Sequence, residues 1–419
     1  MAGELNQSFL LNNSVVQALG TSQLIYVLVS AQPIGTEMSM QMPLNFGLVL
    51  DRSGSMAGSK IDSLREAVKL LAGRMSPQDV VSIVIFDDKA DVLVSSQPIG
   101  QQHQLMAQIN NISDRGGTEM SKGMRRGLEQ IRQYATPDRI SRMLLLTDGE
   151  TWGDEEQCKQ IASECGQAGI PISVFGLGDE WNSGLLDAIA GSSGGNSDFL
   201  SVPEKIMSEF ERTLRSMQGT VVKNASLTLR LVPGVTPRSA WRLQPQISKL
   251  DHRHLSDRDV QIHLGDINRD TGQSILIELV MQPRNPGTFR VAQTEITYDV
   301  PSTGVTGERV RQDILLTLTS DPAQVQRPNP EVMNLVEKVS MFKLQTRALS
   351  EAQSGNNEKA TQLLRIGATR LLEMGEADLA QTFEQEASSL EQGGGLTASG
   401  TKKLQYQTRK LTQRLDDNP

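Results

Sequence analysis

Cysteine is scarce in this sequence, because the 419 residues include only Cys158 and Cys165. Both lie in a segment with helical patterning, where a separation of seven residues corresponds to about 10 Å along the axis. That distance is too long for a disulfide bond between them. We therefore expect two buried thiols in a reducing compartment, and the cytoplasm is the expected location.

Long apolar runs and an excess of basic charge are also absent. No run approaches the roughly 18 apolar residues of a membrane-spanning helix, and the start, MAGELNQSFLLNNS, lacks the basic-then-apolar pattern of a signal peptide. The 41 basic and 49 acidic residues give a net charge of −8, whereas proteins that bind nucleic acid or membrane surfaces are normally basic. The sequence predicts no membrane span and no nucleic-acid partner.

Histidine is scarce as well, with four scattered residues. Neither a Ser-His-Asp nor a Cys-His catalytic arrangement fits them, so we expect no catalytic residues and no enzymatic activity. His252 and His254, in DHRHL, would face the same way on a strand and could bind a transition metal. No third ligand is apparent in the sequence, so solvated histidines are favoured over a metal site.

Residues 44–218 alternate strand and helix patterns. The short apolar runs LNFGLVL, VVSIVIF, RMLLLT and IPISVFGL are rich in branched residues, as strands covered on both faces are. ADVLV follows VVSIVIF closely and predicts an antiparallel edge strand. Helical patterning occupies the intervening segments, roughly 58–75, 102–112, 119–135, 154–168, 183–190 and 203–217. This alternation indicates an α/β domain with a mostly parallel sheet and helices on both faces.

Residues 219–320 have a different pattern. Apolar and polar residues alternate with period two in segments such as NASLTLRLV and SILIELVM, and turn-rich stretches such as INRDTG separate them. That pattern predicts a flanking antiparallel β-sandwich. Residues 1–43 include the strand-like run LIYVLV, which has no evident place in the α/β domain. We expect these N-terminal strands to complete the sandwich, so that the α/β domain is inserted into it.

Helical patterning returns after a proline-containing linker. It predicts a C-terminal helical domain at 331–392, followed by the glycine-rich stretch GGGLTASG and a basic helix at 401–416. The last helix has one apolar stripe, so it can dock on an acidic partner or fold back onto the chain. Folding back is the favoured outcome.

Polar side chains follow the first predicted strand in FGLVLDRSGSM (46–56). Asp51, Ser53 and Ser55 alternate there, and together they offer a carboxylate and two hydroxyl oxygens. An aspartate after a strand is often a helix cap, and Ser-Gly-Ser is ordinary turn material. Taken alone, the three residues are therefore compatible with a purely structural role. A phosphatase-like nucleophile is rejected for Asp51, because Ser53 stands where that chemistry usually has a second acid.

Two further oxygen donors occur at predicted loops of the same domain. Thr118 lies in GGTEM, which opens a helix, and Asp148 ends the strand in LLLTDGE. Ligands of open α/β sheets bind at the carboxyl ends of the strands. Hard oxygen donors suit Mg²⁺, Mn²⁺ or Ca²⁺, and no soft ligand competes with them.

DRSGS, GGT and TDG, in this order and domain pattern, resemble the von Willebrand factor A (vWA) domain. They match the three parts of its metal-ion-dependent adhesion site (MIDAS). The resemblance covers about residues 44–218 and implies a doubly wound, Rossmann-like sheet with the first and fourth strands adjacent. It also implies direct ligation by hydroxyls and partly water-mediated ligation by carboxylates. The implied metal ligands are Asp51, Ser53, Ser55, Thr118 and Asp148.

The function implied by this resemblance is recognition rather than turnover. We expect a metal-dependent protein-binding adaptor or scaffold, in which Mg²⁺ (or Mn²⁺ or Ca²⁺) binds an Asp or Glu of a protein partner. AAA+ ATPases, kinases and phosphatases are possible partners by family association only. The alternative is a structural assembly subunit whose sandwich and helices make the contacts, with the metal stabilising the loops.

Three neighbours of these loops are candidate ligand contacts. Trp152 follows TDGET, and Trp181 follows the next strand in GDEWNSG, so both belong at the same edge of the sheet. Aromatic side chains anchor protein interfaces, although they also cover the ends of sheets. Arg52 flanks the first loop, but the direction of its side chain cannot be read from sequence.

Overall fold

The computed structural model describes residues 5–34, 41–100 and 102–413. The chain divides into two compact units. We call Ser39–Thr220 the α/β unit. The sandwich–helix unit joins Met1–Met38 to Val221–Pro419. The α/β unit therefore interrupts the sequence of the other unit.

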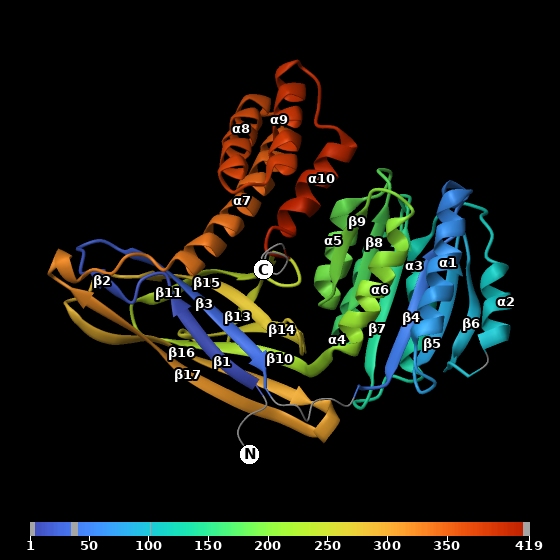
Figure 1. The fold of residues 1–419 in the computed structure, drawn as a ribbon, viewed down its shortest axis with the longest axis horizontal. Coiled ribbons are helices and arrows are strands. Elements are labelled where there is room, and N and C mark those ends of the chain that lie inside the picture. Colours follow the sequence, from blue (N-terminus) through green and yellow to red (C-terminus); the bar gives the residue numbers. More distant parts are fainter. Residues whose placement is uncertain (1–4, 35–40, 101, 414–419) are drawn as a thin grey trace. The chain divides into compact units, whose positions relative to one another are not determined.

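The α/β unit contains one six-stranded sheet in the order β6-β5-β4-β7-β8-β9 (Figure 1). Its strands are β4 (Leu44–Asp51), β5 (Val80–Phe86), β6 (Ala90–Pro98), β7 (Ile140–Thr147), β8 (Ile172–Leu177) and β9 (Asn196–Leu200). The central strand, β4, pairs in parallel with both β5 and β7, so the strand order reverses at β4. Only β6 is antiparallel, at the edge. The predicted doubly wound, mostly parallel sheet is confirmed.

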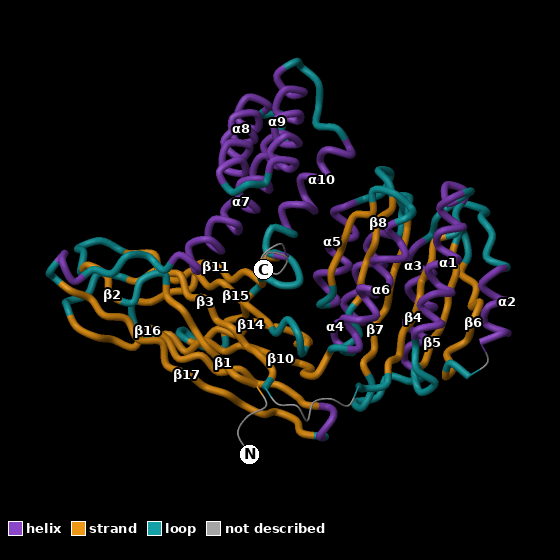
Figure 2. Tube along the Cα trace, viewed as in Figure 1, coloured by secondary structure: helices purple, strands orange, loops and turns teal. Residues whose placement is uncertain are grey.

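Helices cover both faces of this sheet (Figure 2). One face shares a core with α1 (Ser59–Arg74), α2 (Gln102–Asn110) and α6 (Lys205–Gln218). The other face carries α3 (Met120–Arg132), α4 (Glu155–Gln167) and α5 (Ser183–Ser193). Cys158 and Cys165 are buried free thiols in α4, as predicted, and burial raises the pKa of Cys165 to about 12.

Two sheets of the sandwich–helix unit share one apolar core. The five-stranded sheet contains β1 (Leu5–Leu11), β3 (Gln23–Pro33), β15 (Gln273–Met281), β11 (Val235–Arg242) and β12 (Ser248–Leu250). The six-stranded sheet contains β13 (His252–His254), β14 (Asp259–Asn268), β10 (Thr220–Leu231), β16 (Gly287–Val300), β17 (Val305–Thr319) and β2 (Val15–Gln17). Strand β3 pairs antiparallel with β1 and β15, so strands from the N-terminal segment form part of the sandwich.

Four helices follow the sandwich: α7 (Pro330–Gln353), α8 (Asn357–Glu373), α9 (Ala377–Glu391) and α10 (Ala398–Arg409). They share a core with Leu28, Trp241 and Leu276 of the five-stranded sheet. Helix α10 contacts α7 and α9, and the backbone N–H of Ile247 donates to the Arg409 carbonyl at 2.8 Å. The basic helix thus folds back, and residues 414–416 of its predicted span lie outside the described residues.

None of the helices in the described part of the chain has both the length and the apolar character that crossing a bilayer requires.

A close contact seats α3 on the sheet next to the strand ends. A Cβ atom at Gly123 would lie 2.6 Å from the ring of Phe86, the last residue of β5, and Phe86 is fully buried. The absence of a side chain therefore lets the first turns of α3 approach β5. This contact fixes the helix whose N-terminus follows the loop with Thr118.

We predict that Gly123→Ala lowers the free energy of unfolding by about 1–3 kcal/mol, because the added methyl group overpacks a buried ring. Gly73→Ala is the matched control, since Gly73 lies in α1 and has no atom within 4 Å of the added Cβ. That control should be about 1 kcal/mol more stable than the wild type, because alanine is the better helix former. Urea denaturation measures both, and equal stabilities of the two variants would contradict the close contact.

Candidate metal centre

Strand β4 carries Asp51 to the carboxyl edge of the sheet. All eight residues of β4 are buried, and its last residue, Asp51, pairs with Phe86 of β5. The chain then makes a short 3-10 helix, η2 (Gly54–Met56), in which Met56 is buried. The buried Met56 directly follows Ser55, so it holds the loop of Ser53 and Ser55 close to the end of the sheet.

The carboxylate of Asp51 is fully buried and doubly hydrogen bonded. Its Oδ2 accepts from Thr147 Oγ1 of β7 at 2.5 Å, and its Oδ1 accepts from the Ser53 backbone N–H at 2.8 Å. Burial raises the pKa of Asp51 to about 6; the hydrogen bonds from Thr147 and Ser53 oppose this rise, and the charge of Asp148 adds to it. A nearby cation would therefore stabilise the ionised form of this carboxylate.

The hydroxyls of Ser53 and Ser55 connect this loop to the loop after β7. Their Oγ atoms lie 3.0 Å apart, and Ser55 Oγ donates to Asp148 Oδ1 at 2.7 Å. Asp148 is buried, and its Oδ2 lies 2.5 Å from the Nζ atom of Lys60 in α1. Three of the five predicted ligands therefore meet in one chain of contacts, beside Asp51.

Thr118 comes to the same place from the loop before α3. A Cβ atom built at Gly149 would lie 3.6 Å from Thr118 Oγ1 and 3.7 Å from Ser55 Oγ. Both hydroxyls therefore border the space beside Gly149, which follows Asp148. The structure brings the predicted ligands from all three loops to one edge of the sheet.

The loop that carries Thr118 is fixed by backbone contacts. The Gly54 N–H donates to the Gly116 carbonyl at 3.1 Å, and the Arg115 N–H donates to the Arg52 carbonyl at 2.8 Å. Gly116 has a φ of 72°, and a Cβ atom there would lie 2.9 Å from Asp88 Oδ2. A larger residue would be strained at this position and would crowd Asp88, so the glycine allows the two loops to pair.

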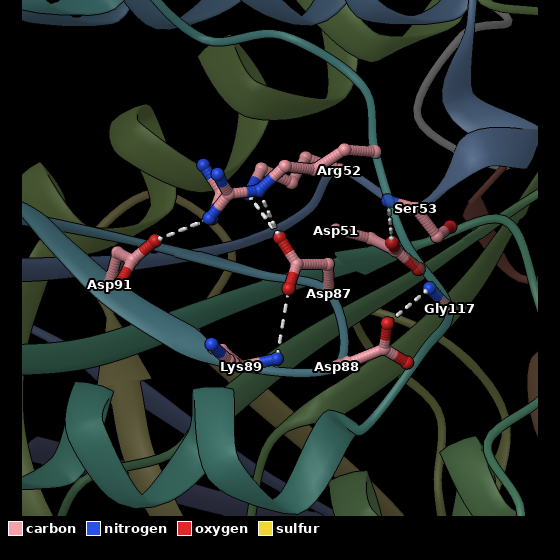
Figure 3. Close-up of polar contacts among 9 residues, drawn as sticks. Asp51, Arg52, Ser53, Asp87, Asp88, Lys89, Asp91 and Gly117 are labelled. Carbon is pink, nitrogen blue, oxygen red and sulfur yellow. Dashed lines mark hydrogen bonds and ion pairs between the residues drawn. The ribbon is translucent and has the colours of Figure 1, made fainter.

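Figure 3 shows a network of acids and arginines that supports these loops. Arg52 is only 6% exposed; its Nε lies 2.8 Å from Asp87 Oδ2 and its guanidinium also reaches Asp91. Arg115 Nε binds the same Asp87 oxygen at 2.9 Å. Burial alone would raise the pKa of Asp87, but hydrogen bonds from Arg115, the Lys89 backbone and Arg52, with the charge of Arg52, hold it below its usual value.

This network revises the expectation for Arg52. Its guanidinium is held by Asp87 and Asp91, so in this structure it positions the first loop and does not face a partner. Asp87 and Asp91 were not predicted from the sequence, although the acid-rich stretch FDDKAD at the end of β5 was the available signal.

The two candidate tryptophans lie in opposite environments. Trp152 is 79% exposed. Trp181 is 3% exposed; its Nε1 donates to the Gly178 carbonyl at 2.6 Å, and its ring fills the space over Gly176. Trp181 thus covers the end of the sheet, which was the structural alternative to a contact role, and only Trp152 can meet a partner in this structure.

The oxygen donors at this edge fit a small divalent cation. They comprise two buried carboxylates and three hydroxyls, which are hard ligands of the kind that Mg²⁺, Mn²⁺ and Ca²⁺ prefer. Among the described residues, no three or more His, Cys, Asp or Glu side chains gather into a metal-binding group. Any cation here would therefore depend on Ser53, Ser55 and Thr118 as well as on the acids.

The rings of His252 and His254 pack together 5.4 Å apart in β13.

We predict that Asp51→Asn stabilises the protein in EDTA at pH 7.5 by up to about 3 kcal/mol. The pKa of Asp51 is raised from 3.8 to about 6 in the folded state, so the folded protein binds a proton at Asp51 more tightly than the unfolded protein does. Wild-type stability should therefore fall as the pH rises from about 4 to about 6 because of this group, and stay lower above pH 6. Asparagine carries no charge and so has no such penalty, but its single oxygen can accept only one of the two hydrogen bonds, which makes about 3 kcal/mol the upper limit of the gain.

Urea denaturation of both proteins at several pH values between 4 and 8 measures this difference. The gap in stability between Asp51→Asn and the wild type should open between about pH 4 and about pH 6 and then remain constant up to pH 8. If Asp51→Asn were less stable than the wild type at pH 7.5, this would contradict a buried Asp51 carboxylate with a raised pKa.

Two family models match this sequence. Residues 45–211 match the von Willebrand factor type A domain, and residues 330–414 match the Sll0103-like, C-terminal alpha-helical domain. The chain is 24% identical over 377 residues to the protein sll0103 of Synechocystis sp., and the alignment covers 89% of each chain. The similarity to that protein therefore extends beyond the α/β unit.

Two solved structures share the fold over nearly the whole chain. A von Willebrand factor type A protein from Catenulispora acidiphila has a TM-score of 0.77 and 17% identity, with 96% of each chain covered. VWA2, an ArnB paralog from Sulfolobus acidocaldarius, has a TM-score of 0.57 and 12% identity, with 97% of this chain and 98% of that one covered. At these identities the likeness shows the fold alone.

Proposed function

Because the chain contains a von Willebrand factor type A domain, we propose that it is a metal-dependent adaptor or scaffold that captures an acidic side chain of a protein partner. Mg²⁺ is the expected ion, with Mn²⁺ or Ca²⁺ as alternatives. When bound, the cation supplies an open, positively charged coordination position for the partner's carboxylate. The residues that would hold it are Asp51, Ser53, Ser55, Thr118 and Asp148.

The observation that carries this proposal is the meeting of Ser53, Ser55 and Asp148. Their oxygens form a chain with separations of 3.0 and 2.7 Å, although Ser55 and Asp148 are 93 residues apart in sequence. Neutral hydroxyls can ligate a cation without cancelling its charge, whereas further carboxylates would cancel it. A set rich in hydroxyls therefore favours attraction of an external carboxylate over full neutralisation within the protein.

The hydrogen bonds of Asp51 fit a role through water, as the resemblance to the vWA domain implies. Each of its oxygens already accepts one hydrogen bond, Oδ2 from Thr147 Oγ1 and Oδ1 from the Ser53 N–H. These bonds orient the carboxylate and keep it buried next to the serine loop. Its charge then acts on the centre over a short distance, in surroundings with little water to screen it.

We predict that Asp51→Asn abolishes metal-dependent partner capture while the protein stays folded. The asparagine removes a charge from the centre and keeps the shape of the side chain. Affinity capture from the native cell, with and without EDTA, followed by identification of the bound proteins, measures this. The wild type should release its specific partners in EDTA, and Asp51→Asn should not bind them even with Mg²⁺ present.

Asp114→Asn is the matched control, because Asp114 is an exposed acid in the loop that carries Thr118. It should bind like the wild type. If capture were insensitive both to EDTA and to Asp51→Asn, the adaptor hypothesis would be wrong. A structural assembly subunit is the second candidate; in that case chelation would lower the melting temperature without releasing partners. Metal-dependent turnover of a substrate panel would instead point to an enzyme.

Trp152 is the candidate aromatic anchor for the partner. Its neighbours Thr151 and Asp154 are buried and hydrogen bonded to each other, and Thr151 Oγ1 also accepts from the Met120 N–H at 3.3 Å. The loop is thus held at both sides while the indole lies in solvent. An exposed indole on a loop that is held in place can bury a large apolar area at little cost in backbone entropy.

We predict that Trp152→Ala weakens binding of a captured partner by about tenfold or more, which corresponds to a loss of over 1 kcal/mol. Its affinity for Mg²⁺ should not change, because the indole supplies no ligand. Leu372→Ala, at an exposed apolar residue of α8, is the control and should leave partner binding unchanged. Calorimetric titration with the purified partner and with Mg²⁺ separates the two effects. Unchanged partner affinity in Trp152→Ala would exclude the indole from the interface.

A further inference from the structure

An ammonium group of the chain lies at the candidate metal centre. Lys60, in the first turn of α1, places its Nζ atom 2.5 Å from Asp148 Oδ2. The other oxygen of that carboxylate accepts from Ser55 Oγ. The side chain of Asp148 is fully buried, whereas that of Lys60 is 31% exposed, so the lysine reaches the carboxylate from the solvent side. One of the two acids of the centre therefore already has a counter-ion.

This ion pair conflicts with the loading of a metal. A divalent cation held by Ser55 and Asp148 would lie within a few ångströms of the Lys60 ammonium. Like charges at about 4 Å repel strongly where water is partly excluded. The lysine is the partner that can move, because its ammonium is carried on a flexible four-carbon stem and its side chain has a path to solvent.

We propose that Lys60 is a built-in counter-ion that competes with the divalent metal for Asp148 and so sets the metal concentration at which the centre loads. This inference rests on the proposed function, because it takes the metal to be held by these loops. In the metal-free protein, Lys60 keeps Asp148 paired and ties α1 to the loop after β7. On loading, the ammonium leaves Asp148 and turns towards solvent.

A second lysine of α1 offers a matched control for this proposal. Lys69 lies in the same helix as Lys60, its side chain has a similar exposure of 27%, and it pairs with Glu66 at 2.7 Å. Lys69→Met therefore removes one lysine charge and one ion pair from α1 without touching Asp148. Lys60→Arg keeps the charge at the centre, and Lys60→Gln removes the charge while keeping a hydrogen-bond donor.

We predict that Lys60→Met and Lys60→Gln bind Mg²⁺ and Mn²⁺ about tenfold more tightly than the wild type, in line with the size of effect that a nearby charge has on a carboxylate. Lys69→Met and Lys60→Arg should bind like the wild type. Calorimetric titration of EDTA-treated protein with each metal gives the affinities. In EDTA, Lys60→Met should also melt at a lower temperature than Lys69→Met, because it leaves a buried carboxylate without a counter-ion.

Each outcome has a distinct meaning. Tighter metal binding by the Lys60 variants, including binding where the wild type shows none, supports the competition. Equal or weaker affinity in Lys60→Met and Lys60→Gln, with a wild type that binds metal, overturns the competition and leaves the proposed function standing. Failure of every protein to bind Mg²⁺, Mn²⁺ or Ca²⁺ overturns both. If Lys60→Met does not fold in EDTA, Lys60→Gln supplies the comparison.

Discussion

The buried carboxylate of Asp51 is the constraint on which the polar edge of the α/β unit depends. It ends a strand with no exposed residue, so its charge has no access to bulk water. The protein compensates with one hydrogen bond from Thr147 of β7 and one from the Ser53 backbone. The bond from Thr147 joins the ends of β4 and β7, and the bond from Ser53 folds the first loop back onto Asp51. A carboxyl group with a pKa raised to about 6 by burial costs stability, and such groups are concentrated at functional sites.

The surrounding structure holds this edge in one arrangement. Arg52 and Arg115 share the Asp87 carboxylate, which ties the first loop and the Thr118 loop to the end of β5. Phe86, the last residue of β5, fits against Gly123 and seats α3. The three hydroxyls, which come from the first loop and the Thr118 loop, are therefore positioned before any ligand arrives. Pre-organisation of this kind reduces the entropy that binding would otherwise cost.

Much of this arrangement could be predicted from the sequence, because parallel strands covered on both faces are apolar throughout and end at one edge. That pattern placed DRSGS and TDG at the same edge of the sheet. The resemblance to the vWA domain, which implies that the strands before them are adjacent, then placed Asp51, Ser55 and Asp148 together. Side-chain directions could not be predicted. Trp181 turns inward because Gly176 leaves room for its ring, and Arg52 turns inward because Asp87, 35 residues later, receives it.

Lys60 shows the same limit. The predicted helix at 58–75 agrees with α1, but nothing local indicates that a lysine in its first turn faces an acid 88 residues later. The contact with Asp148 exists only once α1 and the loop after β7 lie against each other. The sequence predicts only anionic and neutral oxygens at this centre, whereas the structure also places the cationic ammonium of Lys60 there.

The most direct test of a metal centre at these loops is anomalous X-ray diffraction from crystals of this protein grown with Mn²⁺. One strong anomalous peak is expected at the carboxyl edge of the α/β sheet, about 2.2 Å from the hydroxyl oxygens of Ser53, Ser55 and Thr118. The Lys60 ammonium is expected to have moved away from Asp148. A crystal saturated with Mn²⁺ that has no peak at this edge, or that has the three hydroxyls beyond coordination distance of the ion, would contradict such a centre.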